Sequence, residues 1–364
     1  MRPIRVVVVE DSLTVRKRLL EVVAADRELE IVGEGENGQQ AIDLCERLRP
    51  DVISMDMMMP VMTGLAATEH IMAYCPTPII IVSSSTNRGE LFQTYDALKA
   101  GAVDVLDKPR GDEPDDRWEK KLVSSLKLVS RIKVITHPRG RMGVRVRSGA
   151  DVRPGSDSNG PAALLGTASR YELVAIGAST GGPNAIVEIL RNLPAKFALP
   201  ILLVIHIGAP FGATFAEWLD RQSHLRVTTP VNGDPLPRRG EARVVLAPPD
   251  QHLVVRSGRL WLTTDPERHS CRPSVDVLFE SIAGECAHKT VACLLTGMGR
   301  DGALGLSAIQ RAGGMTVAQD EATSVVFGMP REAILLGAAK RVVPLPDVAP
   351  LLAQLAVAEP RSER

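Results

Sequence analysis

Four ionisable residues in the first third of the chain follow short apolar segments. Glu10 and Asp11 come directly after one such segment, Asp56 after a second and Lys108 after a third. Apolar runs of this length predict buried strands, so each charged group is expected at the carboxyl end of a strand. In an open α/β sheet these ends line the crevice where ligands bind. Three carboxylates and one ammonium group in that crevice indicate a site for a cation and a phosphoryl group.

The chemistry expected there is phosphoryl transfer to a carboxylate. Crowded carboxylates disfavour one another's ionisation, and a Mg²⁺ ion relieves this because it accepts carboxylate oxygens and keeps several waters. Asp56 could then attack phosphorus and form an acyl phosphate. Ser83 ends another predicted strand and could donate a hydrogen bond to a phosphoryl oxygen, and Lys108 could pair with it as a point charge. Solvent-facing strand ends would explain any one acid, but not the joint pattern.

A second chemical motif lies in the segment 174–183, whose pattern predicts a strand, a tight turn and a helix that begins near Pro183. Gly177-x-Ser179-x-Gly181 has the spacing of a nucleophile elbow, in which small neighbours expose the serine oxygen. N–H groups at the start of the helix could hold an oxyanion. Two alternatives remain: an ordinary tight turn with an incidental serine, and a dinucleotide-binding turn. The latter would need glycine at position 179 and an acid about twenty residues downstream.

A serine hydroxyl needs a base, and two residues of the second half lie at predicted strand ends. His206 follows the apolar run 201–205, and Asp301 follows the run 291–295 within a glycine-rich turn. With Ser179 they could form a nucleophile, a base and an orienting carboxylate in one crevice. The chain has seven histidines, and only its position after a predicted strand selects His206 as the candidate base. The order Ser…His…Asp differs from that of α/β-hydrolases, which argues against an ordinary lipase-type esterase.

Alternating strand and helix patterns position the ionisable residues of the first third of the chain. Apolar runs predict five strands, at 4–10, 30–33, 52–56, 79–83 and 103–106. Amphipathic helical patterns lie between them, the first with Ser12 as its expected cap and the last covering 115–134. Five such units indicate a flavodoxin-like, doubly wound parallel sheet with strand order 2-1-3-4-5, over residues 1–133.

Residues 134–169 are rich in glycine, serine, arginine and proline and are expected to be a solvated linker. A second doubly wound α/β pattern occupies residues 170–360. Its expected strands are 173–176, 201–205, 291–295 and 315–318, and its expected helices are 183–191, 211–221, 274–285 and 303–311. The stretch 243–264 differs, because it predicts two or three short strands with a β-hairpin turn at Ser257-Gly258.

The composition bounds the class of protein. The chain has 364 residues, of which 45% are hydrophobic and 24% charged, and its formal net charge is zero. This composition is typical of a globular protein of about two domains. The zero net charge gives no overall attraction for nucleic acid, and no apolar run is long enough to insert into a membrane. Five cysteines without a Cys-x-x-Cys pair, and no signal peptide, favour a reduced cytoplasmic chain. His269-x-Cys271 is only a weak indication of a metal site.

The first half resembles a two-component receiver domain over residues 3–133. The motifs that carry this resemblance are Val8-Val9-Glu10-Asp11-Ser12, Asp56 with Met59-Pro60 and Gly64, Ser83-Ser84, and Lys108-Pro109. The resemblance implies that Asp56 is phosphorylated by a histidine kinase, and that Glu10, Asp11, Asp56 and the backbone carbonyl of Met58 hold Mg²⁺. Receivers usually carry an aromatic switch residue three positions before the lysine, where this chain has Val105.

The second half resembles the catalytic domain of chemotaxis protein-glutamate methylesterases, the CheB family. The motifs are Gly177-Ala-Ser-Thr-Gly-Gly, Ala247-Pro248 with His252, Arg272-Pro-Ser-Val-Asp276, Thr296-Gly-Met-Gly-Arg-Asp-Gly302 and Phe327-Gly-Met-Pro-Arg-Glu-Ala333. The resemblance implies that Ser179 is the nucleophile, His206 its base and Asp301 the partner of the histidine. It also implies that Thr180 and Met298 contribute to the oxyanion or substrate site.

The resemblance further implies a substrate and partners. The substrate would be a glutamate γ-methyl ester on the helical cytoplasmic part of a methyl-accepting chemotaxis receptor, with glutamine deamidation as a related activity and no cofactor for the esterase reaction. We expect the unphosphorylated receiver to cover the esterase cleft. Two other classes are weighed: a phosphorylation-dependent adaptor, which the Ser179, His206 and Asp301 set argues against, and a transcription factor, for which a basic helix-turn-helix pattern is lacking.

Overall fold

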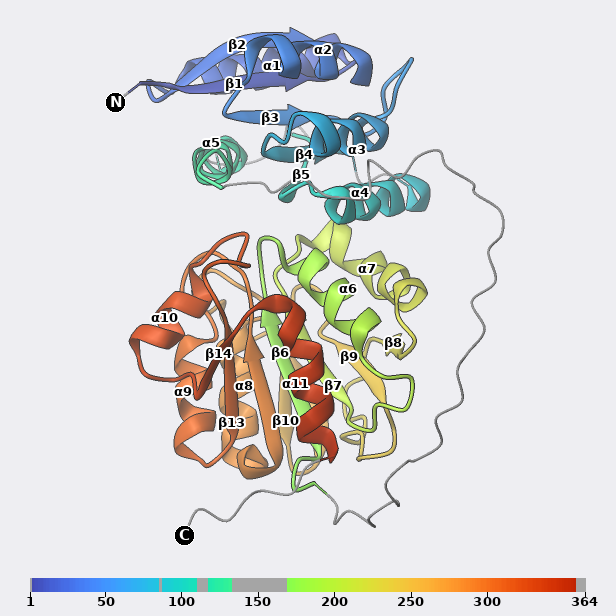
Figure 1. Cartoon of the computed structure of the whole chain (residues 1–364), viewed down its shortest axis with the longest axis vertical. Helices are drawn as coiled ribbons and strands as arrows, with labels where there is room; N and C mark the ends of the chain where they lie inside the picture. The colour runs from blue at the N-terminus through green and yellow to red at the C-terminus, as the bar shows by residue number, and fades with distance from the viewer. Residues whose placement is uncertain (1, 85–86, 110–116, 133–168, 358–364) are drawn as a thin grey trace, which may run out of the picture.

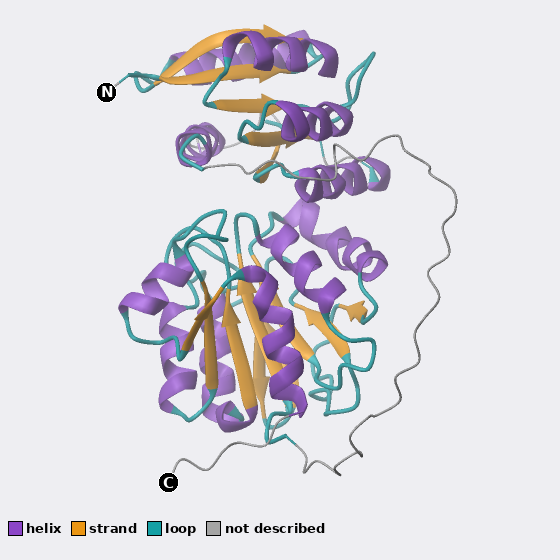
Figure 2. Cartoon of the chain, viewed as in Figure 1, coloured by secondary structure: helices purple, strands orange, loops and turns teal. Residues whose placement is uncertain are grey.

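Two parallel sheets organise the chain in the computed structural model, which describes residues 2–84, 87–109, 117–132 and 169–357 (Figure 1). The expected linker 134–169 falls almost wholly outside these described residues. Helices pack on both faces of the larger sheet (Figure 2). In the smaller sheet, Val7 and Val9 face one core cluster while Val6 and Val8 face another, so this sheet is also buried on both sides.

The smaller sheet has the order β2-β1-β3-β4-β5, and all its strand pairs are parallel. Its strands are β1 (Ile4–Val9), β2 (Leu29–Gly35), β3 (Val52–Met55), β4 (Ile79–Ser83) and β5 (Asp104–Asp107). Its helices are α1 (Leu13–Ala24), α2 (Gly38–Leu48), α3 (Gly64–Tyr74), α4 (Arg88–Ala100) and α5 (Arg117–Val129). The predicted flavodoxin-like order is therefore confirmed.

Local capping chemistry explains where several of these helices begin. The side chains of Asn37, Thr63 and Asn87 accept hydrogen bonds from backbone N–H groups in the first turns of α2, α3 and α4. The expected cap of α1 is wrong in its detail. Ser12 occupies the N-cap position, but its side chain makes no capping hydrogen bond. Its backbone N–H instead donates to the Glu10 carboxylate at 3.2 Å, which ties this turn to the acidic pocket.

The larger sheet has seven parallel strands in the order β14-β13-β12-β6-β7-β9-β8. Its strands are β6 (Leu173–Ala178), β7 (Ile201–Ile205), β8 (Arg226–Thr228), β9 (Arg243–Leu246), β12 (Thr290–Leu294), β13 (Met315–Gln319) and β14 (Arg341–Val343). Its helices are α6 (Gly182–Asn192), α7 (Ala209–Gln222), α8 (Val275–Glu285), α9 (Ala303–Arg311), α10 (Met329–Leu335) and α11 (Leu345–Val357), with a 3₁₀ turn η2 (Ala287–Lys289).

The predicted hairpin is present as β10 (His252–Arg256) and β11 (Arg259–Thr263), which turn at Ser257 and Gly258 as expected. The first strand predicted in that stretch, β9, belongs to the large sheet instead, where it pairs with β7 and β8. The edge strands β8 and β14 and the helices α10 and α11 were not predicted. Among the described residues, no helix combines the length and apolarity needed to cross a bilayer.

The two halves meet through α4, which lies against α6 and α7 (Figure 1). The ring of Tyr95 is buried there, with its centroid 5.4 Å from that of Phe215 and 5.3 Å from that of Trp218. Its hydroxyl donates to the Phe211 carbonyl. An amide hydrogen bond from Asn184 to a carbonyl of α4 at 2.7 Å adds a polar contact. The first domain is thus seated over the end of the second domain at which β6 and β7 terminate.

Candidate functional site

The acidic pocket forms where β1 and β3 end side by side. Asp56 directly follows β3, and its backbone N–H donates to the Val9 carbonyl at 2.9 Å. Carboxylate oxygens of Glu10, Asp11 and Asp56 lie within 4.8 Å of one another. Glu10 and Asp56 are buried, whereas Asp11 is exposed. The structure therefore brings together the three acids singled out by their position after predicted strands.

The charge balance of this pocket favours a cation. Nζ of Lys108 lies 2.8 Å from Oε1 of Glu10 and 2.9 Å from Oδ2 of Asp56, so one ammonium group faces two buried carboxylates. Burial, reinforced by the charge of Asp56, raises the pKa of Glu10 to about 7. Burial also raises the pKa of Asp56, although Lys108 opposes this. Oε2 of Glu10 is buried without a hydrogen-bond partner among the described residues, and an ion with oxygen ligands such as Mg²⁺ fits it.

The other predicted residues of this pocket lie at the same end of the sheet. Ser83 is buried at the end of β4, and its carbonyl accepts a hydrogen bond from the Lys108 N–H at 3.1 Å. Met58 lies two residues after Asp56 with an exposed side chain, in the loop where its carbonyl is expected to serve as a ligand. Val105, at the usual aromatic position, is partly buried against the core and lines the cleft shared with the second domain.

The tight turn after β6 presents Ser179 at the start of α6. A Cβ atom at Gly177 would lie 2.2 Å from a methyl carbon of Val275, so no larger residue fits there. Gly181 has a φ of +77°, and a Cβ atom there would lie 2.5 Å from that of Val325. Close packing therefore requires both glycines of the Gly-x-Ser-x-Gly motif, and the backbone conformation of the turn also requires Gly181.

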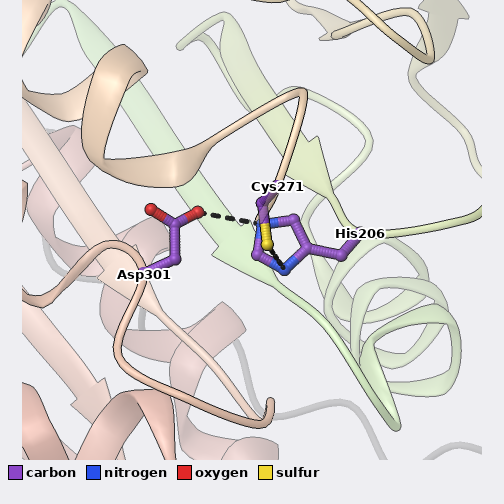
Figure 3. Close-up of side chains that lie close together, drawn as sticks. All are labelled: His206, Cys271 and Asp301. Carbon is purple, nitrogen blue, oxygen red and sulfur yellow. Dashed lines mark hydrogen bonds and ion pairs between the residues drawn. The ribbon is translucent and has the colours of Figure 1, made fainter. Parts of the chain in front are cut away.

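His206 and Asp301 are joined directly. Nε2 of His206 lies 2.9 Å from Oδ2 of Asp301 (Figure 3). His206 directly follows β7, and Asp301 comes from the loop after β12. The predicted histidine–carboxylate pair is thus present, although its residues come from strands on opposite sides of β6.

The contacts of His206 and Asp301 shift their pKa values in opposite directions. Burial alone would raise the pKa of Asp301, but hydrogen bonds from His206, Ser274 and the Val275 N–H hold it below its ordinary value. Burial likewise opposes the charged form of His206. Its hydrogen bonds to Asp301 and Cys271 prevail and raise the pKa of His206 to about 9. The imidazole is therefore a strong proton acceptor that is held by an ionised carboxylate.

Ser179 shares a cleft with this pair. β6 and β7 are neighbouring parallel strands whose register aligns Ala178 with Ile205, so Ser179 and His206 occupy the next aligned positions. Both line a cavity of about 320 Å³. No hydrogen bond joins the Ser179 hydroxyl to the imidazole in the part of the chain that the structure describes. Hydroxyl, imidazole and carboxylate therefore reach one crevice, while the proton-transfer contact itself is not formed in this arrangement.

The two residues expected to assist at the oxyanion differ in exposure. Thr180 is buried beside Ser179, and its carbonyl accepts a hydrogen bond from the Thr296 hydroxyl at 2.9 Å. Met298 is 54% exposed in the loop that leads to Asp301. The preceding residue, Gly297, packs tightly on Ser179, since a Cβ atom at Gly297 would lie 2.8 Å from the Cβ of Ser179.

Sequence reasoning missed the residues that hold Asp301. Its Oδ1 accepts from the Ser274 hydroxyl at 2.7 Å and from the Asp276 N–H at 3.1 Å, and its Oδ2 accepts from the Val275 N–H at 2.7 Å. These groups form the N-terminus of α8, which favours a negative charge. Sequence reasoning also missed that Cys271 contacts the histidine: its Sγ lies 3.7 Å from Nδ1 of His206 (Figure 3). The signal was the Arg272-Pro-Ser-Val-Asp276 motif.

The weak metal indication at His269 and Cys271 separates into two groups in the structure. Cys271 lies with His206 and Asp301, while His269 lies with Asp276 and Asp301. Nε2 of His269 is 3.1 Å from a carboxylate oxygen of Asp276, so this histidine already has a hydrogen-bond partner. Asp276 is itself buried, and it accepts a hydrogen bond from the Gly305 N–H at 2.7 Å. These contacts connect His269 to the first turn of α8, where Asp276 lies.

The fold and these two sites define a class of protein: a response regulator whose receiver domain is joined to an α/β output domain with a serine, histidine and aspartate cleft. Family comparisons agree with this class. The response regulator receiver domain model matches residues 6–114, and the CheB methylesterase model matches residues 174–352.

Relatives of nearly the same length narrow the class to a family. A protein of Nitrosospira multiformis is 42% identical over 356 residues, covering 97% of each chain, and one of Pseudomonas aeruginosa is 41% identical over 360 residues, again covering 97% of each. Both are named protein-glutamate methylesterase/protein-glutamine glutaminase. The crystal structure of the Thermotoga maritima CheB methylesterase catalytic domain matches at 36% identity with a TM-score of 0.48, covering 51% of this chain and 98% of that one. This chain belongs to the CheB family of protein-glutamate methylesterases/protein-glutamine glutaminases.

Proposed function

We propose that this chain demethylates glutamate γ-methyl esters on methyl-accepting chemotaxis receptors, deamidates receptor glutamines, and is controlled by phosphorylation of Asp56. The observation that carries the proposal is the 2.9 Å contact between His206 and Asp301 in the cleft that Ser179 lines. The names of its full-length relatives support the substrate class. Because the substrate lies on the cytoplasmic part of the receptor, the enzyme works in the cytoplasm.

The acylation step uses the three groups in sequence. Asp301 accepts only, so Nε2 of His206 carries a proton toward it and Nδ1 is the nitrogen that takes the proton of Ser179. The serine oxygen then attacks the ester carbonyl carbon and forms a tetrahedral intermediate. His206 returns the proton to the methoxy oxygen, the C–O bond breaks, and methanol leaves. A water molecule, deprotonated by the same imidazole, hydrolyses the acyl-enzyme to the glutamate and regenerates Ser179.

The oxyanion of this intermediate needs donors near Ser179. The candidates are backbone N–H groups at the start of α6, beside Thr180, and those of the loop around Met298, whose Gly297 packs on Ser179. Each such donor typically contributes roughly 3–4 kcal/mol to the transition state. The same cycle applied to a glutamine side chain releases ammonia instead of methanol, which accounts for deamidation without a cofactor.

Phosphorylation is assigned to the first domain. Glu10, Asp11, Asp56 and the Met58 carbonyl would hold Mg²⁺, which supplies charge neutralisation at the phosphoryl oxygens. Asp56 accepts the phosphoryl group from a histidine kinase, and Ser83 and Lys108 bind its oxygens. These assignments are supported by the buried, unpaired Oε2 of Glu10 and by the position of Lys108.

Regulation follows from what covers the esterase cleft. Asp104, Val105 and Lys121 of the receiver line the same cavity as Ser179 and His206. These residues hinder the approach of a receptor helix to Ser179, so the unphosphorylated chain keeps only a low basal activity. We assign phosphorylation of Asp56 the role of weakening this docked arrangement, so that the cleft opens.

The test is mass spectrometry of a methylated receptor co-expressed with this chain. The wild-type chain should remove methyl groups from receptor glutamates and convert glutamines to glutamates. The Ser179→Ala variant should leave both modifications unchanged. Equal loss of methyl groups with the variant would refute the proposal.

A further inference from the structure

A second cavity, of about 480 Å³, opens beside the esterase cleft. Its walls include His269, Met298, Arg300, Asp301 and Glu332, all from the second domain. The two cavities share Ser270 and Cys271 as a common wall. Since Asp301 lines one cavity and His206 the other, the catalytic pair stands between them. Described residues of the receiver line the first cavity, whereas none of them lines the second.

Exposed apolar side chains of α10 follow a residue in the wall of this second cavity. Glu332 lies in the cavity wall, and Leu335 and Leu336 follow three and four positions later. Residues at this spacing share one face of a helix, and Leu336 keeps a right-handed helical backbone. Leu335 is 68% exposed, Leu336 51% and Met298, which also lines the cavity, 54%. We call Met298, Leu335 and Leu336 the α10 stripe.

The fold itself does not explain the α10 stripe. Helix α10 is anchored by Met329, Pro330 and Ala333, which are buried against the sheet and α9. The two leucines are largely exposed, and α10 lies at the edge of the domain away from α4 (Figure 1). Large apolar side chains that adjoin a cavity and are rimmed by charged groups mark an interaction surface. Arg300 and Glu332 supply that charged rim.

We propose that the receptor helix carrying the modified glutamate lies across the second cavity and packs its neighbouring apolar side chains on the α10 stripe. This inference rests on the proposed function. The occupant is that helix because its modified side chain must enter the adjoining cleft. One turn of a helix advances only about 5.4 Å, so neighbouring turns stay close to the cleft. We place the next turns of the same helix over the second cavity, because that cavity shares the wall formed by Ser270 and Cys271 with the cleft. Because no described residue of the receiver lines this cavity, we expect the docked chain to bind the receptor through the stripe before it can hydrolyse it.

The experiment measures affinity and hydrolysis separately. The full chain is titrated with a purified, methylated cytoplasmic fragment of a chemotaxis receptor that the wild-type chain binds. The Leu335→Glu/Leu336→Glu double variant should weaken binding at least about tenfold, since interface leucines are replaced by charges. Leu335→Met/Leu336→Met should restore affinity. The matched control is Val231→Glu, at a position 70% exposed beyond the opposite edge strand β8, and it should bind within about twofold of wild type.

Two further readouts separate docking from catalysis. Hydrolysis of a short peptide with one γ-methyl glutamyl ester should be the same in the double variant and the wild type, because the peptide does not reach α10. Hydrogen exchange of the wild-type chain should show α10 protected by the receptor fragment. Unchanged affinity of the double variant, or no protection of α10, overturns the docking proposal. Failure of the wild-type chain to cleave the peptide or the receptor would instead count against the proposed function.

Discussion

Oδ2 of Asp301 lies 2.9 Å from Nε2 of His206 and 2.7 Å from the backbone nitrogen of Val275. In the serine-protease triad the carboxylate faces Nδ1 and leaves Nε2 for the serine. In the proposed mechanism the two nitrogens of His206 exchange these roles, since Nε2 must carry the proton that Asp301 accepts. We infer that Nδ1, which now has Cys271 at 3.7 Å, is the atom that receives the proton of Ser179.

The first prediction concerns pH. Because its hydrogen bonds to Asp301 and Cys271 outweigh burial and raise the pKa of His206 to about 9, the imidazole is mostly protonated at neutral pH and acts as a base only after losing a proton. The kcat/KM for methanol release should therefore rise by about tenfold per pH unit and level off near the pKa. A profile measured between about pH 6 and 10 that is flat below pH 9 would contradict this. Ser179→Ala sets the background rate.

The second prediction concerns Asp301→Asn. The amide cannot accept from His206, Ser274 and Val275 as a charged group does, so kcat should fall by roughly 10³–10⁴-fold. The free energy of unfolding should also fall, by about 1–3 kcal/mol, because the α8 N-terminus loses its anion.

Acid provides the control for that stability change. The pKa of Asp301 is lowered in the fold, so its contribution to stability is present at neutral pH and is lost as pH falls through the folded-state pKa. The difference between wild type and variant in urea unfolding should shrink in acid. A difference that is constant with pH would show that the charge does not matter.

The third prediction concerns the contact between the domains. Tyr95→Ala removes a ring packed against Phe215 and Trp218, together with the hydrogen bond to the Phe211 carbonyl. Truncating a buried aromatic of this kind typically costs about 2–4 kcal/mol of interface energy. The unphosphorylated variant should therefore release methanol several-fold faster than wild type. Tyr74→Ala, which removes a ring 58% exposed on α3, should leave basal activity unchanged. Equal basal rates in all three proteins would exclude this contact as the inhibitory one.

The fourth prediction separates metal dependence between the domains. With acetyl phosphate as donor, the chain should gain a phosphoryl group only when Mg²⁺ is present, because Glu10, Asp11 and Asp56 need the ion to approach a phosphoryl oxygen. EDTA and Asp56→Asn should each abolish phosphorylation. Basal methanol release should persist under both treatments. Loss of basal release with EDTA would mean that the esterase reaction uses a metal.

The strand ends were the part of the structure most open to prediction. Glu10, Asp56, His206 and Asp301 each follow a strongly apolar run, and parallel topology then gathers such residues at one edge. The edge strands β8 and β14 have three residues each and mostly exposed or half-buried side chains, so they carry little hydrophobic signal. The conformation of the loop that holds Cys271 cannot be predicted from the hydrophobic pattern either. His269 and Ser270 have left-handed φ values of 52° and 59° there, which only the folded loop imposes.

The contacts around Asp301 show a second limit. Ser274 and Val275 reach it because α8 begins beside the β12 loop, and nothing in the local sequence reports that approach. The burial of Tyr95 against α7 is similar, since its partners lie in the other domain. Both depend on how whole elements pack.

Release of methanol from a methylated receptor, measured per chain, tests the central claim most directly. Wild type, Ser179→Ala and His206→Gln are compared after each has been shown to accept a phosphoryl group on Asp56. The account predicts turnover in the wild type alone, with all three chains phosphorylated equally. Methanol release by phosphorylated Ser179→Ala at the wild-type rate would contradict it.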